Sequence, residues 1–212
     1  TNRKPYLNLH HLVINSTNSR MKIARIALLF FFGSVLSGLS QTVNSLTAIE
    51  VVSGAQKTAA ALLKEKGLVL VFHDPSCPFA SLYENRIKAL QSKFEGQGIG
   101  FALVNPHRSS SESDLKELRT YCTENGLNLP YLVDDQQLWT TYFKASKIPE
   151  ALLLLPTSGG VEVVYKGAID NNAQLETAVT ARYLEQAIFQ VLRGENPAVG
   201  QVRAVGCTIR SY

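Results

Sequence analysis

Cys77 is the residue whose type and position best suit a chemical role. It stands in "LVLVFHDPSCPFA", where an apolar run ends in a short polar turn and a proline follows the cysteine. The thiolate is the reactive form, and the positive end of a helix dipole helps a cysteine to ionise. Pro78 suits a first helical turn, because the N–H that it lacks would be unpaired there. The position where a second cysteine would form a local disulfide is Ala80. Any redox partner of Cys77 must therefore come from elsewhere in the chain.

Two further cysteines, Cys122 and Cys207, are candidates for that partner. An odd and small number of cysteines indicates one pair and one bystander, not a scaffold held by many disulfides. Cys122 lies within a predicted helix, where a free cysteine is commonly a small core residue. Cys207 lies in a tail bounded by Gly200 and Gly206, and a tail can approach and retract as a resolving thiol must. The sequence alone allows all three pairings, and we favour Cys77 with Cys207.

Two charged neighbours bear on the ionisation of Cys77. Asp74 lies three residues before the thiol, and a nearby carboxylate opposes formation of a thiolate. His73 would balance Asp74 if the two side chains pair. We expect Cys77 to be exposed, because sites at the carboxyl ends of sheet strands open into a crevice.

The elements that must position these residues follow a regular order. Continuous apolar runs predict buried strands at 68–73 and 99–105, with a helix that starts at Pro78 between them. The next elements are a capped helix at 109–126, a short strand at 129–135 and a short helix at 136–145. A hairpin at 151–167 comes next. The last helix has an apolar side that starts at Leu175, and it stops at Gly194. This order predicts an α/β fold with a central mixed sheet, helices on both faces and an irregular C-terminal tail.

The N-terminal part has the character of a targeting segment. Residues 1–40 hold five basic side chains and no acidic ones, which leaves 16 basic and 17 acidic residues, a net charge of −1, for the remainder. We therefore expect no nucleic-acid binding. "MKIARIALLFFFGSVLSGLSQ" predicts a signal peptide at 21–40, cut near Ser40, with 1–20 as upstream sequence. The predicted location is outside the cytoplasm, with an uncleaved membrane anchor as the alternative.

The chain resembles the thioredoxin-like superfamily, and within it a peroxiredoxin-like branch related to redoxins and alkyl hydroperoxide reductase. The motifs that carry the resemblance, in order, are "SCPFASLYENRI", "NLPYLVDDQ", "IPEALLL", "YKGAIDNN", "YLEQAI" and "VGCTIR". They cover about residues 65–210. We place the thioredoxin-like domain at 65–194, an N-terminal extension of it at 41–64 and the tail with Cys207 at 195–212.

The resemblance implies an exported thiol oxidoreductase that uses no cofactor. Cys77 would attack a peroxide or a protein disulfide, Cys207 would resolve the intermediate, and an external reductant, a thioredoxin-like protein or a small thiol, would regenerate the pair. Pro149 would follow a cis peptide bond and place backbone opposite the sulfur, where an extended substrate can pair. Ser76 and Pro78 flank the thiol and are the other candidate substrate contacts.

Some positions depart from the branch. Peroxiredoxins proper carry threonine or serine three residues before the reactive cysteine, where this chain has Asp74. Their oxyanion-stabilising arginine has three candidates here, Arg86, Arg108 and Arg119. Two rival functions follow: a redox-silent thioredoxin-like binding module, and a carrier of a soft metal ion. The candidate ligands of such an ion are His73, Cys77, His107 and Cys207.

Overall fold

A computed structural model of the chain describes Thr1 and residues 45–211. The chain divides into two units, residues 1–40 and 41–212, and the helices and strands given below all belong to the second. The predicted signal peptide and, apart from Thr1, the predicted upstream segment lie outside the described residues. Within the described part of the chain, no helix is both long enough and apolar enough to cross a membrane.

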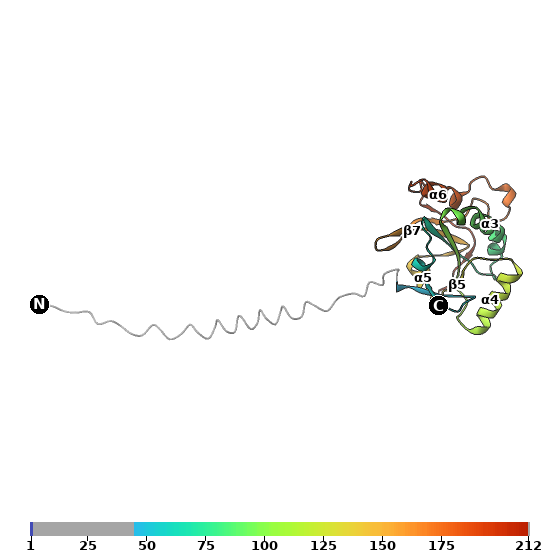
Figure 1. Ribbon diagram of the computed structural model, residues 1–212, viewed down its shortest axis with the longest axis horizontal. Helices are drawn as coiled ribbons and strands as arrows, with labels where there is room; N and C mark the ends of the chain where they lie inside the picture. The colour runs from blue at the N-terminus through green and yellow to red at the C-terminus, as the bar shows by residue number, and fades with distance from the viewer. Residues whose placement is uncertain (2–44, 212) are drawn as a thin grey trace. The chain divides into compact units, whose positions relative to one another are not determined.

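Strands and helices alternate through the middle of the domain, a strand hairpin and a last helix follow, and two short strands come after that helix (Figure 1). The strands are β1 (Thr47–Glu50), β2 (Gln56–Thr58), β3 (Gly67–Phe72), β4 (Ile99–Asn105), β5 (Tyr131–Val133), β6 (Lys147–Ile148), β7 (Glu150–Thr157), β8 (Gly160–Gly167), β9 (Gln201–Val202) and β10 (Cys207–Thr208). The helices are α2 (Ala59–Leu62), α3 (Pro78–Phe94), α4 (Glu112–Glu124), α5 (Leu138–Tyr142) and α6 (Tyr183–Leu192), with 3-10 turns η2 (Glu95–Gln97) and η3 (Glu176–Ala178).

Eight strands form one mixed sheet in the order β2-β1-β5-β4-β3-β7-β8-β9. Strands β3, β4 and β5 are parallel, and β7 joins β3 antiparallel before the β7–β8 hairpin. β10 and β6 form a separate two-stranded ladder. This is the predicted central mixed sheet with flanking helices, and the prediction of the fold class is confirmed.

The sheet has two buried faces because its central strands alternate between two apolar clusters. In β3, Val69 and Val71 belong to the cluster that includes α3, α4 and α6, whereas Leu68 and Leu70 belong to the cluster that includes α2 and α5. All four side chains are buried. A strand covered on both faces is therefore apolar throughout, which explains the continuous run in the sequence.

Residues 45–64 add two strands to one side of this sheet, and β2 forms its edge. β1 pairs antiparallel with β5, with Ile49 opposite Val133, and β2 pairs with β1. Thr58 caps the short helix α2 by accepting a hydrogen bond from the backbone N–H of Ala61 at 3.2 Å. The segment before β3 therefore belongs to the same sheet as the rest.

The last helix is shorter than the sequence analysis predicted. We expected its apolar side to start at Leu175, but α6 begins at Tyr183. Two asparagine side chains hold the preceding segment in turns: Asn171 accepts from the N–H groups of Thr180 and Ala181, and Asn172 accepts from that of Leu175. These side chains bind backbone groups that a helix would need.

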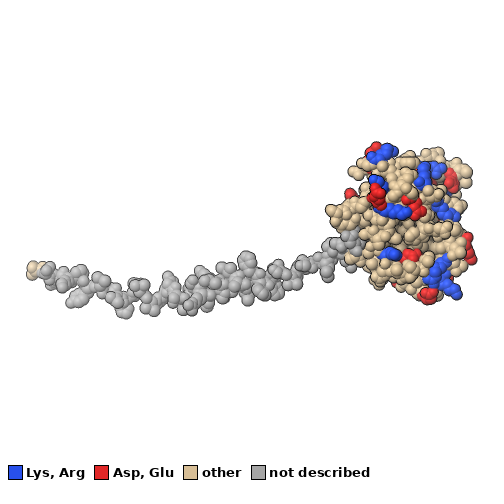
Figure 2. Space-filling model, in the orientation of Figure 1, with Lys and Arg blue, Asp and Glu red and all other residues tan. Residues whose placement is uncertain are grey.

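The C-terminal segment is more ordered than the expected irregular tail. β9 joins the sheet parallel to β8, and β10 pairs with β6, which lies before Pro149. Ala204 and Ile209 are buried. The segment therefore lies docked against the domain. On the face seen in Figure 2, basic and acidic side chains of the described residues are interspersed.

Candidate active site

Cys77 is the N-cap residue of α3, and Pro78 occupies the first turn. The preceding loop is a tight turn in which the N–H of Cys77 donates to the carbonyl oxygen of Asp74 at 2.9 Å. The first N–H groups of a helix have no partner within the helix, and their partial positive charge favours an anion at this end. The predicted strand-turn-helix setting of Cys77 is therefore present, and it favours a thiolate once the sulfur is reduced.

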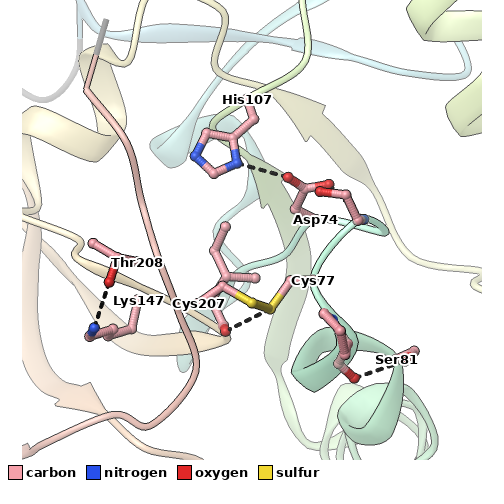
Figure 3. The surroundings of a disulfide bond; sticks show 10 residues. Asp74, Cys77, Ser81, His107, Lys147, Cys207 and Thr208 are labelled. Atoms are coloured by element: carbon pink, nitrogen blue, oxygen red, sulfur yellow. Dashed lines mark hydrogen bonds and ion pairs between the residues drawn. A yellow bond between two sulfur atoms is a disulfide. The ribbon is translucent and has the colours of Figure 1, made fainter.

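Cys77 and Cys207 form a disulfide across a sequence separation of 130 residues, with their Cα atoms 6.1 Å apart (Figure 3). Of the three pairings that the sequence allowed, this is the one we favoured. Cys122, the free cysteine, is buried on α4. Burial raises the pKa of the Cys122 thiol to about 11, with a smaller contribution from Glu84, so Cys122 is a poor nucleophile at neutral pH.

The expected exposure of Cys77 is not found in the oxidised protein. Its exposed fraction is 3%, because the segment that carries Cys207 covers it. The sulfur of Cys77 also lies 3.3 Å from the carbonyl oxygen of Ile148. A short C-terminal segment covers Cys77 and is bonded to it through Cys207. Opening the disulfide is therefore also the step that allows this segment to move away and expose the sulfur of Cys77.

The segment around Cys207 lies as an added strand against the residues before Pro149. In the β10–β6 ladder, Cys207 stands opposite Ile148 and Thr208 opposite Lys147. The next N–H, that of Ile209, donates to the carbonyl oxygen of Ser146 at 3.0 Å. The Ile148–Pro149 peptide bond is cis, as the resemblance implied.

Two side chains outside this ladder hold the backbone of Arg210. The Nε2 atom of His107 accepts a hydrogen bond from the N–H of Arg210 at 3.2 Å. Gln137 donates through Nε2 to the carbonyl oxygen of Arg210 at 2.8 Å and to that of Pro106 at 2.9 Å. Sequence reasoning named His107 only as a possible metal ligand and did not name Gln137, because both side chains bind backbone atoms far along the chain. Together they hold the tail at Arg210, near the last described residue.

Asp74 is buried and fully paired. Burial by itself raises the pKa of this carboxyl, but the N–H of Ser76 at 2.9 Å and the imidazole of His107 at 2.8 Å outweigh it and hold the pKa below its usual value. Figure 3 shows the carboxylate of Asp74 directed toward His107. His107, and not His73, is the histidine that pairs with Asp74.

His73 belongs to a separate buried network. Its Nδ1 lies 2.8 Å from the hydroxyl of Tyr131 and its Nε2 lies 3.2 Å from a carboxylate oxygen of Glu84. Tyr121 donates to the same Glu84 oxygen, and Asn105 donates to Tyr131. His73 is fully buried. The network joins the residue after β3 to α3, α4, β4 and β5, and we assign it a structural role.

The three arginines considered as oxyanion-stabilising residues are all bound to carboxylates. Arg86 forms a buried pair with Asp170 at 2.8 Å, and Tyr83 donates to the same carboxylate. Arg108 binds Asp114 and Glu117, and Arg119 binds Glu112. The Arg86 pair is buried, whereas the pairs of Arg108 and Arg119 are partly exposed.

The remaining candidate contacts lie around the disulfide. Ser76, in the turn before Cys77, and Pro78, the first residue of α3, are exposed, whereas Pro149 is buried. A cleft of about 470 Å³ lies next to Pro149, and among its lining residues are Phe79 of α3, Arg203 and Val205 of the C-terminal segment, and Pro149 itself. An extended substrate therefore has a hollow beside the site.

The metal-ligand set considered in the sequence analysis does not assemble. Both sulfurs are bonded to one another, His73 binds Tyr131 and Glu84, and His107 binds Asp74. Within the described part of the chain, no three His, Cys, Asp or Glu side chains are grouped as metal ligands.

No protein-family model and no curated protein matches the sequence. Solved structures do match the fold. An uncharacterized conserved protein from Geobacillus kaustophilus gives a TM-score of 0.69 at 19% identity, over 80% of this chain and 90% of that one. A hypothetical protein from Sinorhizobium meliloti 1021 gives 0.68 at 22% identity, over 81% of this chain and 93% of that one.

Peroxiredoxin Q from Xanthomonas campestris matches with a TM-score of 0.51 at 18% identity, over 72% of this chain and 92% of that one. Fold and comparisons together define the class: this chain has a thioredoxin-like fold with a peroxiredoxin among its structural neighbours. The resemblance stated from the sequence motifs is confirmed at the level of the fold.

Proposed function

We propose that this protein is a thiol-dependent oxidoreductase in which Cys77 and Cys207 form a reversible redox pair. The observation that carries the proposal is the disulfide itself, which joins the N-cap of α3 to a C-terminal strand. A disulfide that only staples a fold has no need of a helix N-terminus at one sulfur. That position favours the thiolate that disulfide exchange requires.

The preferred reaction is exchange with a substrate disulfide. The Cys77 thiolate attacks one sulfur of the substrate, its disulfide breaks, and the other substrate sulfur leaves as a thiolate that takes up a proton. Cys207, once deprotonated, attacks the Cys77 sulfur of the mixed disulfide and releases the second substrate thiol. The substrate gains two electrons and the protein gains the Cys77–Cys207 bond. An external dithiol, or two equivalents of a small thiol, then reduces that bond.

Peroxide reduction is the second candidate, supported by the similarity in fold to peroxiredoxin Q. The Cys77 thiolate would attack one peroxide oxygen, giving a sulfenic acid and an alcohol or water, and Cys207 would condense with the sulfenic acid and release water. Asp74 stands where peroxiredoxins proper carry a hydroxyl, and the three arginines named above are bound to carboxylates. These features favour disulfides over peroxides as substrates.

The place of action proposed from the leader is outside the cytoplasm. An oxidising compartment would keep the pair as a disulfide between turnovers. The reductant would then be a thioredoxin-like protein or a small thiol that reaches the same compartment.

Turnover with three single variants tests the proposal. Purified reduced protein would be mixed with glutathione disulfide or hydrogen peroxide, with excess reductant, and product thiol or peroxide loss would be followed. Cys77→Ser should abolish turnover with either substrate. Without added reductant, Cys207→Ser should stop at one mixed disulfide with glutathione or at the Cys77 sulfenic acid with peroxide. Cys122→Ser, the matched control, should keep full activity. Full activity in Cys77→Ser would overturn the proposal, and a reduced protein in which no thiol reacts quickly with an alkylating reagent would favour the redox-silent binding module.

A further inference from the structure

The residues that surround the C-terminal strand form a binding site for an extended peptide, and the chain's own tail fills it. We call this site the tail groove: β6 with Ser146 before it, the side chains of His107 and Gln137, and the apolar cluster that contains Ile209. We propose that the tail groove binds cysteine-containing extended segments of substrate proteins, with a glycine before the cysteine and an aliphatic residue two positions after it. This inference rests on the proposed function and names its substrate class.

The position before the cysteine has no room for a side chain. A Cβ atom built on Gly206 would lie 2.0 Å from the carbonyl oxygen of Ile148 and 2.7 Å from its carbonyl carbon. Real Cβ contacts do not come so close, and the obstacle is backbone next to Pro149, which cannot rotate away. Any segment that presents its cysteine to Cys77 in this register therefore needs glycine at this position.

The position two residues after the cysteine is an apolar subsite. Ile209 is 9% exposed and belongs to the cluster that contains Trp139, Phe143 and Ile148. Burial of this side chain removes apolar surface from water, which favours an aliphatic residue at this position. The intervening residue, Thr208, is exposed, with its hydroxyl accepting from Nζ of Lys147 at 2.8 Å. The site therefore selects the residue type at the positions of Gly206 and Ile209 and tolerates different side chains at the position of Thr208.

The remaining contacts of the tail groove are made to main-chain atoms of the tail, so they do not depend on which side chains the bound segment carries. The ladder with β6 and the bond from Ile209 N–H to Ser146 bind main-chain atoms. His107 and Gln137 hold the N–H and the carbonyl oxygen of Arg210. Strand addition of this kind supplies affinity through the backbone and selectivity through pockets for individual side chains. Another polypeptide with the same pattern would make the same contacts.

The tail is thus a competitor for the substrate segment. When Cys77 and Cys207 are bonded, the tail groove is filled and Cys77 is covered. Reduction removes the covalent link, and the tail then holds the groove only through the contacts described above. A substrate segment must displace it before its own disulfide reaches Cys77.

Disulfide-linked dimers of a synthetic tail peptide, residues 204–212, test this inference on the full-length Cys207→Ser protein. The Cys77 thiolate attacks one sulfur of the dimer, one peptide stays bound through a mixed disulfide, and the other leaves as a thiol. Mass spectrometry follows the bound peptide, with glutathione disulfide as the reference. The unchanged peptide and its Thr208→Ser form should react at least about tenfold faster than glutathione disulfide. The Gly206→Ala and Ile209→Ser peptides should lose most of that advantage.

The same substitution should act in the opposite direction when it is made in the protein. Ile209→Ser added to the Cys207→Ser chain weakens the competing tail, so the unchanged peptide should react several-fold faster while the glutathione rate changes less. Equal rates for all four peptides, or an equal rise for peptide and glutathione in the Ile209→Ser protein, would overturn the inference and leave the proposed function standing. A Cys77 that reacts with neither peptide nor glutathione disulfide would overturn both.

Discussion

His107 accepts a hydrogen bond from the backbone N–H of Arg210 at 3.2 Å, and its other ring nitrogen lies 2.8 Å from Asp74. The imidazole therefore joins the turn before Cys77 to the tail that carries Cys207. A neutral ring can serve both partners, donating to the carboxylate and accepting from the amide. A ring protonated on both nitrogens has no acceptor left for Arg210.

Replacement of His107 tests this connection. His107→Leu removes the acceptor, and one such hydrogen bond contributes about 1 kcal/mol, so local opening of the tail should rise about fivefold. Amide hydrogen exchange at Ile209 and Arg210 would measure it. Lys147→Ala, which removes only an exposed bond to Thr208, is the control and should change exchange little. Equal exchange in His107→Leu and wild type would show that His107 does not hold the tail.

The fit of Gly206 against Ile148 predicts a strong effect of one methyl group. Gly206→Ala places a Cβ 2.0 Å from backbone oxygen, so the tail must shift, and overpacking of this kind costs about 1–3 kcal/mol. Gly200→Ala is a matched control, since the nearest atom to its Cβ would be 3.5 Å away. In a fixed thiol–disulfide buffer, Gly206→Ala should hold less of the Cys77–Cys207 disulfide than Gly200→Ala. The same disulfide fraction in both variants would contradict the contact.

Asp74 predicts an acid-sensitive contribution to stability. Its pKa in the folded protein lies below the usual 3.8, so the unfolded chain binds the proton more readily as pH falls. Asp74 therefore contributes its full stabilisation when the pH is at least about one unit above its usual pKa of 3.8. This contribution is lost as the pH falls through the lower pKa of the folded protein. Urea unfolding of wild type and Asp74→Asn between pH 6 and pH 2.5 should show a shallower acid loss in the variant. Parallel curves would show that Asp74 does not carry this contribution.

The pair of Arg86 and Asp170 predicts a loss of stability separate from chemistry. Both side chains are buried, and removing one partner of a buried pair costs about 3–5 kcal/mol. Asp170→Ala should therefore lower the free energy of unfolding by that amount. Arg108→Ala removes a more exposed ion pair and should change the free energy of unfolding by less than about 1 kcal/mol. The rate of Cys77 exchange per folded molecule should stay the same in both variants. A faster or slower rate in Asp170→Ala alone would instead connect Arg86 to the reaction.

Much of the domain could be predicted from the sequence because its signals are local. The apolar run 68–73 and the Cys-Pro turn specify a buried strand and a helix start within a few residues of one another, and the structure has β3 and α3 there. The strand predicted at 99–105 has the same bounds as β4. Such elements follow from periodicity and caps, which do not depend on distant partners.

The surroundings of the disulfide could not be predicted in the same way. β10 has two residues and exists only because Cys207 meets Ile148, 59 positions earlier in the sequence. His107 and Gln137 bind the backbone of Arg210. Every residue except proline has the same backbone groups, so the sequence does not show which residue these two side chains bind. The burial of Cys77 has the same origin, since its cover is the tail. The chemistry-bearing residue was visible in the sequence, and the parts that control access to it were not.

A redox titration of the Cys77–Cys207 bond tests the central claim most directly. Full-length protein would be equilibrated in glutathione buffers of graded potential, trapped with an alkylating mass tag and digested to locate the 77–207 linkage. We predict that the bond opens and closes reversibly within the range of the buffers, at a potential above about −300 mV, while Cys122 stays reduced throughout. A 77–207 linkage that stays closed in every glutathione buffer, or one that involves Cys122 instead, would contradict the account.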